Sequence, residues 1–479
     1  MRRWTAAAAA AGVMAMAPAV PCLAQAPVLT PAEVGAAVDA AALALAGDGL
    51  AIAVVDRTGR PLAVFSRAGA TGADREAALG LARTGALFSH DQAPLSSRTV
   101  AFISGPHFPP GIRNTPAGAL FGIELTNRGC DLGVAYLPGQ DLPPAASLAG
   151  GTGTGPVTRP GGVPLYKPDA AGRRRLAGGI GVSGAGGGPS ADLAHEFAAF
   201  SALGAGFAPK VRAPGTIFLD GVELPFVRQR SRPAGFDPGS LAGGYDLGPL
   251  AGDPAPEGYL VGPSAGAMLT APEVDLVVRR AIRAASRTRA AIRLPIGART
   301  RMTIAVTDTD GGVLALYRMP DGTVFSVDVA VAKARNVVWF SDPARPAAEL
   351  PGVPPGTAVT NRTIGFGSQP FFPSGIDDSR PGPFRGLLLA DAALPCTQGS
   401  EPAGPPRNGI VFFPGSSPLY RNGTLAGGLG VSGDGVEQDD YVTAKGARSF
   451  LPPKSLRADR IKIDGVRLPY WKFPRNPER

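Results

Sequence analysis

The segment that decides the fold is residues 52–56, IAVVD, because it returns at residues 304–308 as IAVTD. Seven further pairs repeat in the same order: 29–34 with 269–274, 82–89 with 334–341, 98–99 with 362–363, 108–112 with 372–376, 164–166 with 418–420, 181–184 with 430–433, and 220–225 with 464–469. The offset stays between 240 and 264 residues. A repeat of about 200 residues is too long for a solenoid unit, so the sequence predicts two copies of a whole domain.

The duplication divides the chain into four parts. We expect a signal peptide at residues 1–24, a first copy at 27–228, a Gly/Pro-rich linker at 229–266 and a second copy at 267–479. Arg2 and Arg3 precede an apolar stretch at 6–16, which is too short to span a bilayer and is typical of an export signal. Cleavage after Ala24 is favoured, and the mature chain is then expected in the periplasm or outside the cell.

Hydrophobic periodicity and turn residues predict the elements of each copy. In the first copy we expect helices at 32–45, 75–88 and 192–203, strands at 50–55, 61–66, 120–125 and 176–182, a loop at 89–116 and a hairpin at 217–226 about Asp220-Gly221. The early hairpin favours antiparallel pairing. The predicted fold class is α/β, with a mixed or antiparallel sheet flanked by helices.

Composition and charge exclude several classes of protein. With 44% hydrophobic and 18% charged residues the chain can form a core, although Gly (66) and Pro (50) are abundant. The formal charge of +9 becomes +7 without the signal, and the one notable basic run is 173–175, so nucleic-acid binding is not expected. No later stretch is predicted to cross a membrane. Cys130 and Cys396 could pair in an oxidising compartment, which the sequence alone leaves open.

The order of motifs in each copy resembles the GlcG/HbpS-like family. The first copy has AVVD at 53–56, the Ala82-Arg83 helix ending near Phe88, PGGVPL at 160–165 and GGIGVSG at 178–184. The second copy matches similarly, although PGSSP at 414–418 is looser. The resemblance covers most of both copies and leaves out the long middle loops, the linker and the terminal hairpins.

The resemblance implies binding more than catalysis. Members of the family are linked to haem or corrinoid binding, extracellular redox sensing and glycolate-type metabolism, so haem is the expected cofactor. Packing of the two copies as a pseudo-dimer is also expected, and a higher oligomer is left open. The residue that ligates iron differs among members, so the resemblance does not assign one here.

Histidine is a usual axial ligand of haem iron, and the chain has His90, His107 and His195, all in the first copy. We take His107 and His90 as candidate ligands, because one lies in the Pro-rich loop and the other follows the second helix. An ordinary surface or capping role is the alternative for each of them.

Residues that both copies retain are the other candidates for a ligand site. Arg83, Arg98, Arg335 and Arg362 could clamp a carboxylate, although structural salt bridges are the alternative. Ser183, Gly184, Ser432 and Gly433 could offer backbone N–H groups to a carboxylate, or form a tight turn. The surrounding G-x-G-x-x-G lies inside an apolar strand and lacks the acidic partner of a dinucleotide site.

The sequence shows no catalytic constellation. Ser183 lacks the glycine that a nucleophile elbow needs, and the second copy has no histidine at all. The leading hypothesis is an exported protein that binds haem or a related small ligand for redox sensing or scavenging. An enzyme or accessory protein acting on a small carboxylate, and a structural envelope protein, are the alternatives.

Overall fold

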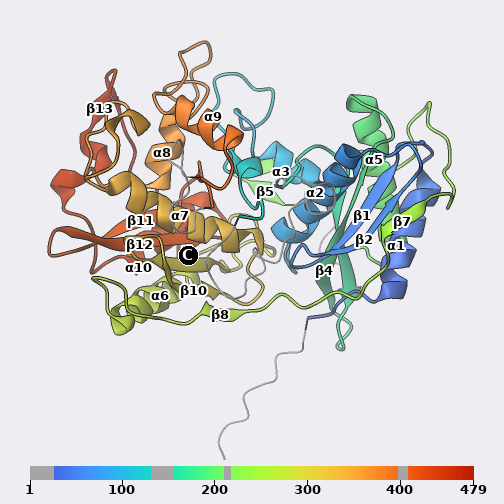
Figure 1. The fold of residues 1–479 in the computed structure, drawn as a ribbon, viewed down its shortest axis with the longest axis horizontal. Helices are drawn as coiled ribbons and strands as arrows, with labels where there is room; N and C mark the ends of the chain where they lie inside the picture. Colours follow the sequence, from blue (N-terminus) through green and yellow to red (C-terminus); the bar gives the residue numbers. More distant parts are fainter. Residues whose placement is uncertain (1–25, 131–154, 210–216, 398–407, 479) are drawn as a thin grey trace, which may run out of the picture.

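Two α/β units of the same design lie side by side in the structure (Figure 1). The computed structural model describes residues 26–130, 155–209, 217–397 and 408–478, so the predicted signal peptide lies outside the described residues. Each unit contains a five-stranded antiparallel sheet, with the order β3-β4-β1-β2-β7 in the first and β11-β12-β9-β10-β8 in the second. The two orders are equivalent, which confirms the tandem α/β domains predicted from the repeats.

The first unit follows the predicted elements closely. Its main elements are α1 (Pro31–Ala44), β1 (Ala51–Asp56), β2 (Pro61–Ser66), α2 (Gly72–Phe88), α3 (Ser97–Phe102), β3 (Gly162–Pro168), β4 (Arg174–Ser183), α5 (Pro189–Ala202), and the hairpin β5 (Phe218–Leu219) and β6 (Val222–Glu223). Thr30 caps α1, because its hydroxyl accepts from the Glu33 amide at 3.3 Å.

The second unit repeats these elements and adds others. It comprises α6 (Ala271–Ala285), β9 (Thr303–Thr307), β10 (Val313–Arg318), α7 (Phe325–Ser341), α8 (Asn361–Gly367), α9 (Arg385–Ala393), β11 (Ser416–Arg421), β12 (Thr424–Ser432), α10 (Val436–Gly446), β13 (Lys462–Ile463) and β14 (Val466–Arg467). None of the helices among the described residues is long and apolar enough to span a bilayer.

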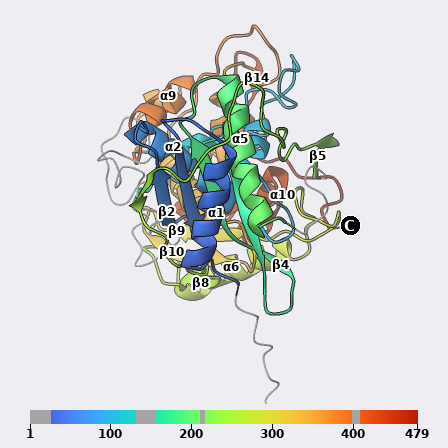
Figure 2. The same cartoon turned by 90° about the vertical axis from the view of Figure 1, so that its right-hand side faces the viewer.

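Each sheet is the middle layer of three. Successive side chains of a strand point to opposite faces, so Ala51, Ala53 and Val55 contact α2 while Ile52 and Val54 join the core beneath α1 and α5. Figure 2 shows α1 and α5 running side by side over that face. In the second unit α7 covers one face, and α6 and α10 cover the other.

The glycines of the predicted G-x-G-x-x-G segment bring helix and sheet together. A Cβ at Gly179 would come 2.3 Å from the Ala82 carbonyl oxygen, and a Cβ at Gly181 would come 2.1 Å from that of Ala78. Gly428 and Gly430 stand in the same relation to α7. The motif therefore permits close helix–sheet packing inside a strand, and it does not form a phosphate loop.

Two sequence predictions differ from the structure. Residues 120–125 form turns and a short 3-10 helix instead of a strand, because their apolar side chains pack into two clusters at the contact between the units. The PGGVPL motif leads into β3, which begins at Gly162 and is an edge strand where Pro164 is tolerated. Segment 229–266, expected to be a linker, contains β7 (Gly244–Leu247) and β8 (Gly258–Val261), one edge strand for each sheet.

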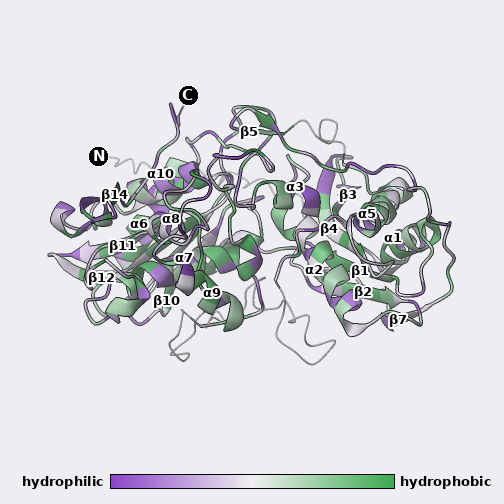
Figure 3. Cartoon of the chain, turned by 90° about the horizontal axis from the view of Figure 1, so that it is seen from above, coloured by the Kyte–Doolittle hydropathy of each residue, from purple (hydrophilic) through white to green (hydrophobic). Residues whose placement is uncertain are grey.

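The two units pack head to tail. The C-terminal end of α2 meets the N-terminal end of α7, where the Val324 amide donates to the Leu87 carbonyl at 3.1 Å (Figure 3). The Phe88 and Phe325 rings stack there with centroids 4.2 Å apart. Because opposite ends of equivalent helices touch, the contact is heterologous and lacks a twofold axis.

A buried ionic network joins the units beside this contact. The Arg293 guanidinium, which is fully buried, pairs with Asp434 at 2.7 Å and with Asp321 at 2.6 Å. Arg57 of the first unit reaches the other oxygen of Asp321 at 2.7 Å. These two arginines hold the pKa of Asp321 well below its usual range. Asp321 is thus shared by cations from both units.

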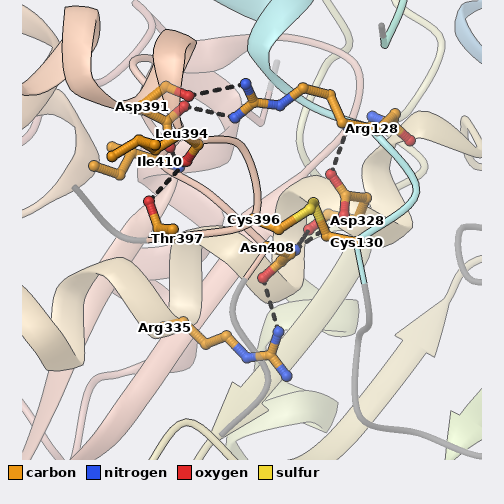
Figure 4. The surroundings of a disulfide bond; sticks show 11 residues. Arg128, Cys130, Asp328, Arg335, Asp391, Leu394, Cys396, Thr397, Asn408 and Ile410 are labelled. Carbon is orange, nitrogen blue, oxygen red and sulfur yellow. Dashed lines mark hydrogen bonds and ion pairs between the residues drawn. A yellow bond between two sulfur atoms is a disulfide. The ribbon is translucent and has the colours of Figure 1, made fainter. Parts of the chain in front are cut away.

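A second set of contacts fastens the units beside α9. The sulfurs of Cys130 and Cys396 form a disulfide that joins positions 266 residues apart (Figure 4). Next to it, Arg128 donates to the Asp391 carboxylate at 2.8 Å, and the Asn127 amide donates to Asp328 at 2.8 Å. The first unit is therefore tied covalently to the segment that follows α9, and by buried polar contacts to α9 and α7.

The disulfide is expected to contribute strongly to stability, since it closes a very long loop. The Cys130→Ser/Cys396→Ser variant should lose about 3–5 kcal/mol of unfolding free energy, because the unfolded chain gains entropy. Urea unfolding of both proteins under oxidising conditions measures the difference. Equal unfolding free energies of the two proteins would contradict the disulfide. In the presence of reductant, the wild type should have the same unfolding free energy as the variant.

Replacing Arg293 tests the ionic network. Arg293→Met leaves Asp434 and Asp321 buried with less compensation, and we expect a loss of about 3–5 kcal/mol in urea unfolding. Arg279→Met is the matched control, because its pair with Asp275 is at an exposed side chain and should be worth at most about 1 kcal/mol. Equal effects of the two substitutions would show that the network does not hold the units together.

Candidate functional site

A cavity of about 610 Å³ lies between the two units. Its apolar wall draws on both of them: Phe88, Leu95, Val100, Ile103 and Leu120 from the first unit, and Ile292, Phe325 and Phe413 from the second. The stacked pair Phe88 and Phe325 is part of this wall. The volume is within the range of small-molecule sites, and neither unit could form the cavity alone.

Charged side chains surround the apolar wall. The lining has three cations, Arg289, Lys472 and Arg475, and three carboxylates, Asp220, Glu437 and the buried Asp439. Lys472 is paired with Glu437, whereas the exposed Arg475 makes no ion pair with another described residue. Arg289 donates to the Arg475 carbonyl at 3.3 Å. The two arginines are therefore available to a ligand carboxylate.

Two buried polar side chains of the cavity lining have unsatisfied atoms. Ser432 ends β12 and is 1% exposed, and its Oγ has no hydrogen-bond partner. Asp439, on α10, accepts from Lys333 Nζ through Oδ2 at 3.0 Å, while its Oδ1 has no partner. Burial raises the pKa of Asp439 to about 7, and the Asp440 and Asp434 carboxylates act in the same direction.

Of the predicted ligand residues, Ser432 and Gly433 line the cavity. Ser183 and Gly184 occupy the equivalent end of the first sheet, away from the second unit. There Ser183 Oγ accepts from the Arg159 guanidinium at 2.7 Å. The structure therefore separates the two Gly-Val-Ser-Gly turns, and it places one of them at the contact between the units.

The predicted arginines occupy equivalent positions in both copies, outside the central cavity. Arg83 donates to the Gly59 carbonyl at 3.1 Å and Arg335 to the Gly311 carbonyl at 3.0 Å, so each supports the first hairpin turn of its own sheet. Burial lowers the pKa of Arg83 to about 10. These contacts provide a structural reason for the retention of both residues.

Arg98 and Arg362 each make an ion pair with the last helix of their own unit. Arg98 pairs with Glu196 and Arg362 with Asp440, both at 2.5 Å. Arg362 also lines a groove of about 470 Å³ that shares Phe413, Glu437 and Lys472 with the central cavity. Arg98 lines the equivalent groove of the first unit.

Neither candidate histidine ligand lines the cavity. His90 is completely buried in the ionic network, with Nε2 3.7 Å from Asp434, and burial lowers its pKa to about 4. His107 stacks on Phe371, and its Nδ1 lies 3.2 Å from the Thr115 carbonyl. Their roles as iron ligands stay predictions. The described residues contain no cluster of three or more His, Cys, Asp or Glu that could hold a metal.

Sequence reasoning missed the residues that make the cavity. Asp439 and Asp440 lie near the start of α10, and both are buried in ion pairs. Phe88, Phe325 and Phe413 read as ordinary core residues. Asp439 and His195 occupy equivalent places in the two copies, and this difference marks the site only when the structure aligns the copies.

Comparison with known proteins supports the family seen in the sequence. The model of the family described as "Haem degrading protein HbpS-like" matches residues 30–199 and 277–448. No curated protein matches the chain.

Two solved structures each match a part of the chain about as long as one copy. A chain titled "Crystal Structure of PduOC:Heme Complex" is 21% identical, with a TM-score of 0.25, over 38% of this chain and 95% of that one. Klebsiella pneumoniae protein ORFY is 18% identical, with a TM-score of 0.25, over 40% of this chain and 95% of its own. At these values neither likeness supports a statement about the ligand. The family matches cover well over half of the sequence, so the chain belongs to the HbpS-like family, with two tandem copies of its domain.

Proposed function

We propose that this chain is an exported protein that binds haem or a related small ligand in the cavity between its two units. The observation that carries the proposal is the composite cavity itself, which combines an apolar wall from both units with Arg289 and Arg475 at its edge. A flat apolar body with carboxylate groups, such as a tetrapyrrole, suits this combination.

The lining does not supply the usual axial ligands of haem iron. Among the described residues that line the cavity there is no His, Cys, Met or Tyr. Haem in this place would therefore be held through its ring faces and carboxylates, without a bond from these residues to iron. Scavenging is then favoured over redox sensing, because sensing depends on protein groups that tune the iron.

Export is supported by the disulfide. A bond between Cys130 and Cys396 is typical of proteins in oxidising compartments, such as the periplasm or the extracellular space. This agrees with the apolar, arginine-flanked start of the sequence. The periplasmic or secreted location is part of the proposal.

The alternative of a small-carboxylate site is less well supported. Arg83 and Arg335, which could have clamped a carboxylate, donate to backbone carbonyls of their own hairpin turns. In the central cavity, Arg289 and Arg475 are the arginines that a carboxylate could meet. A purely structural role predicts that nothing binds there, which the following titration decides.

Titration with haemin and with iron-free protoporphyrin IX tests the proposal. We expect saturable binding of both, with dissociation constants within about threefold of each other, because the lining offers no iron ligand. Arg289→Ala/Arg475→Ala should weaken both by about tenfold, through the loss of charge-assisted hydrogen bonds to the carboxylates. Absorbance and tryptophan quenching report the binding.

Two further variants complete this experiment. Arg283→Ala, at an exposed position on α6, removes the same kind of charge and should leave both affinities unchanged. His107→Ala should likewise leave the haemin spectrum unchanged. A Soret band that is lost in His107→Ala would instead assign an iron ligand, and no saturable binding of either compound would refute a tetrapyrrole site.

A further inference from the structure

Two residues that line the central cavity carry buried oxygen atoms without a hydrogen-bond partner in the protein. Ser432 Oγ and Asp439 Oδ1 are buried, and each lacks a donor among the described residues. An unsatisfied buried polar group costs free energy, and such groups in native proteins call for an explanation. A ligand that donates hydrogen bonds would satisfy both atoms.

The internal duplication shows what the equivalent serine binds in the first copy. A Cβ at Gly161 would meet Val182, Leu81 and His195, and a Cβ at Gly415 would meet Val431, Lys333 and Asp439. Position 439 therefore corresponds to 195, and position 333 to 81. Two residues before these glycines the first copy has Arg159 and the second has Phe413.

In the first copy a cation of the chain itself satisfies the serine. The Arg159 guanidinium donates to Ser183 Oγ at 2.7 Å, and His195 accepts from the Ala185 amide at 2.9 Å. No second unit docks on that end, and Arg159 is exposed. The serine at the end of this strand is thus suited to a nitrogen-bound donor.

In the second copy that internal donor is missing. Phe413 replaces the arginine and contributes to the apolar wall, while Lys333 donates to the Val431 carbonyl at 2.8 Å and to Asp439 Oδ2 at 3.0 Å. Asp439 in place of a histidine adds an acceptor. The second copy therefore has more acceptors and fewer donors than the first, and it has a cavity beside them.

From these contacts we infer that the ligand of the central cavity presents a nitrogen-bound hydrogen-bond donor at its edge to Ser432 and Asp439. The inference rests on the proposed function and narrows its ligand class. The pyrrole nitrogens of a closed porphyrin face the centre of the ring, where a wall residue does not reach them. An open-chain tetrapyrrole can present its N–H groups to a carboxylate, so it is the preferred class.

A matched pair of ligands tests this inference. Biliverdin and protoporphyrin IX both carry two carboxylates, but only the first is open-chain. On the wild-type protein we expect biliverdin to bind about tenfold more tightly, which corresponds to about 1.4 kcal/mol, the size of one charged hydrogen bond. Fluorescence quenching titration of the full mature chain measures both dissociation constants.

Two variants locate the preference. Ser432→Ala removes an unsatisfied acceptor, so it should reduce biliverdin affinity by about fivefold while leaving stability unchanged or increased. Asp439→Leu/Lys333→Leu removes both acceptor oxygens and the buried cation together, and leucine already occupies position 81, which is equivalent to 333. This double variant should abolish the preference for biliverdin over protoporphyrin IX. Asp275→Asn, on α6, is the control and should change neither.

The outcomes separate this inference from the proposed function. Equal affinities for the two ligands in the wild type, or a biliverdin preference that survives in both variants, would refute the donor site while leaving tetrapyrrole binding intact. Failure of every tetrapyrrole to bind would refute both. Selective loss of biliverdin affinity in the two variants, with unfolding by circular dichroism showing that they are folded, is the result we expect.

Discussion

The structure depends on a buried ionic contact between two copies of one domain. Arg57 from one unit and Arg293 from the other pair with the same carboxylate, Asp321, and Arg293 also neutralises Asp434. Removal of any one charge would leave another buried without compensation, so the group acts as a unit. Its geometry fixes how the end of α2 meets the start of α7, and that meeting encloses the cavity.

Sequence differences between the copies explain why the head-to-tail contact forms once and is not repeated at the free end of either unit. The position equivalent to Arg57 is Thr309 in the second copy, and the position equivalent to Asp434 is Ala185 in the first. A head-to-tail contact between identical domains could continue indefinitely, because each added copy exposes the same free end. Here the free ends lack the charges of the occupied ones, and Arg159 covers the unused serine on the first unit.

Most of the fold could be predicted from the sequence because the strands and helices have strong local patterns. The cap formed by Thr30 and the apolar run at 52–55 depend on neighbours in the chain, and the repeat is found by comparing the sequence with itself. The edge strands β7 and β8 could not be predicted from the sequence, since each has four residues and pairs only with a sheet that is formed by other parts of the chain. Residues 120–125 are apolar because their side chains are buried at the contact between the units. From the sequence alone, such a segment cannot be distinguished from an apolar strand.

The candidate site was less predictable for the same reason. Arg83 and Arg335 were correctly recognised as retained, but their partners are backbone carbonyls that no motif encodes. Asp439 is a site residue only when the first unit covers α10. A cavity that forms only where the units meet is marked by residues that differ between the copies, such as Asp439 in place of His195 and Phe413 in place of Arg159. Residues that are the same in both copies are explained by the shared fold.

We propose that one ligand site arises from the contact between the units. Native mass spectrometry of the mature chain, titrated to saturation with a tetrapyrrole, counts the bound molecules directly. We expect one bound molecule per chain, since both units contribute residues to the lining. Two per chain would contradict it, because each copy would then bind on its own and the contact between them would serve stability alone.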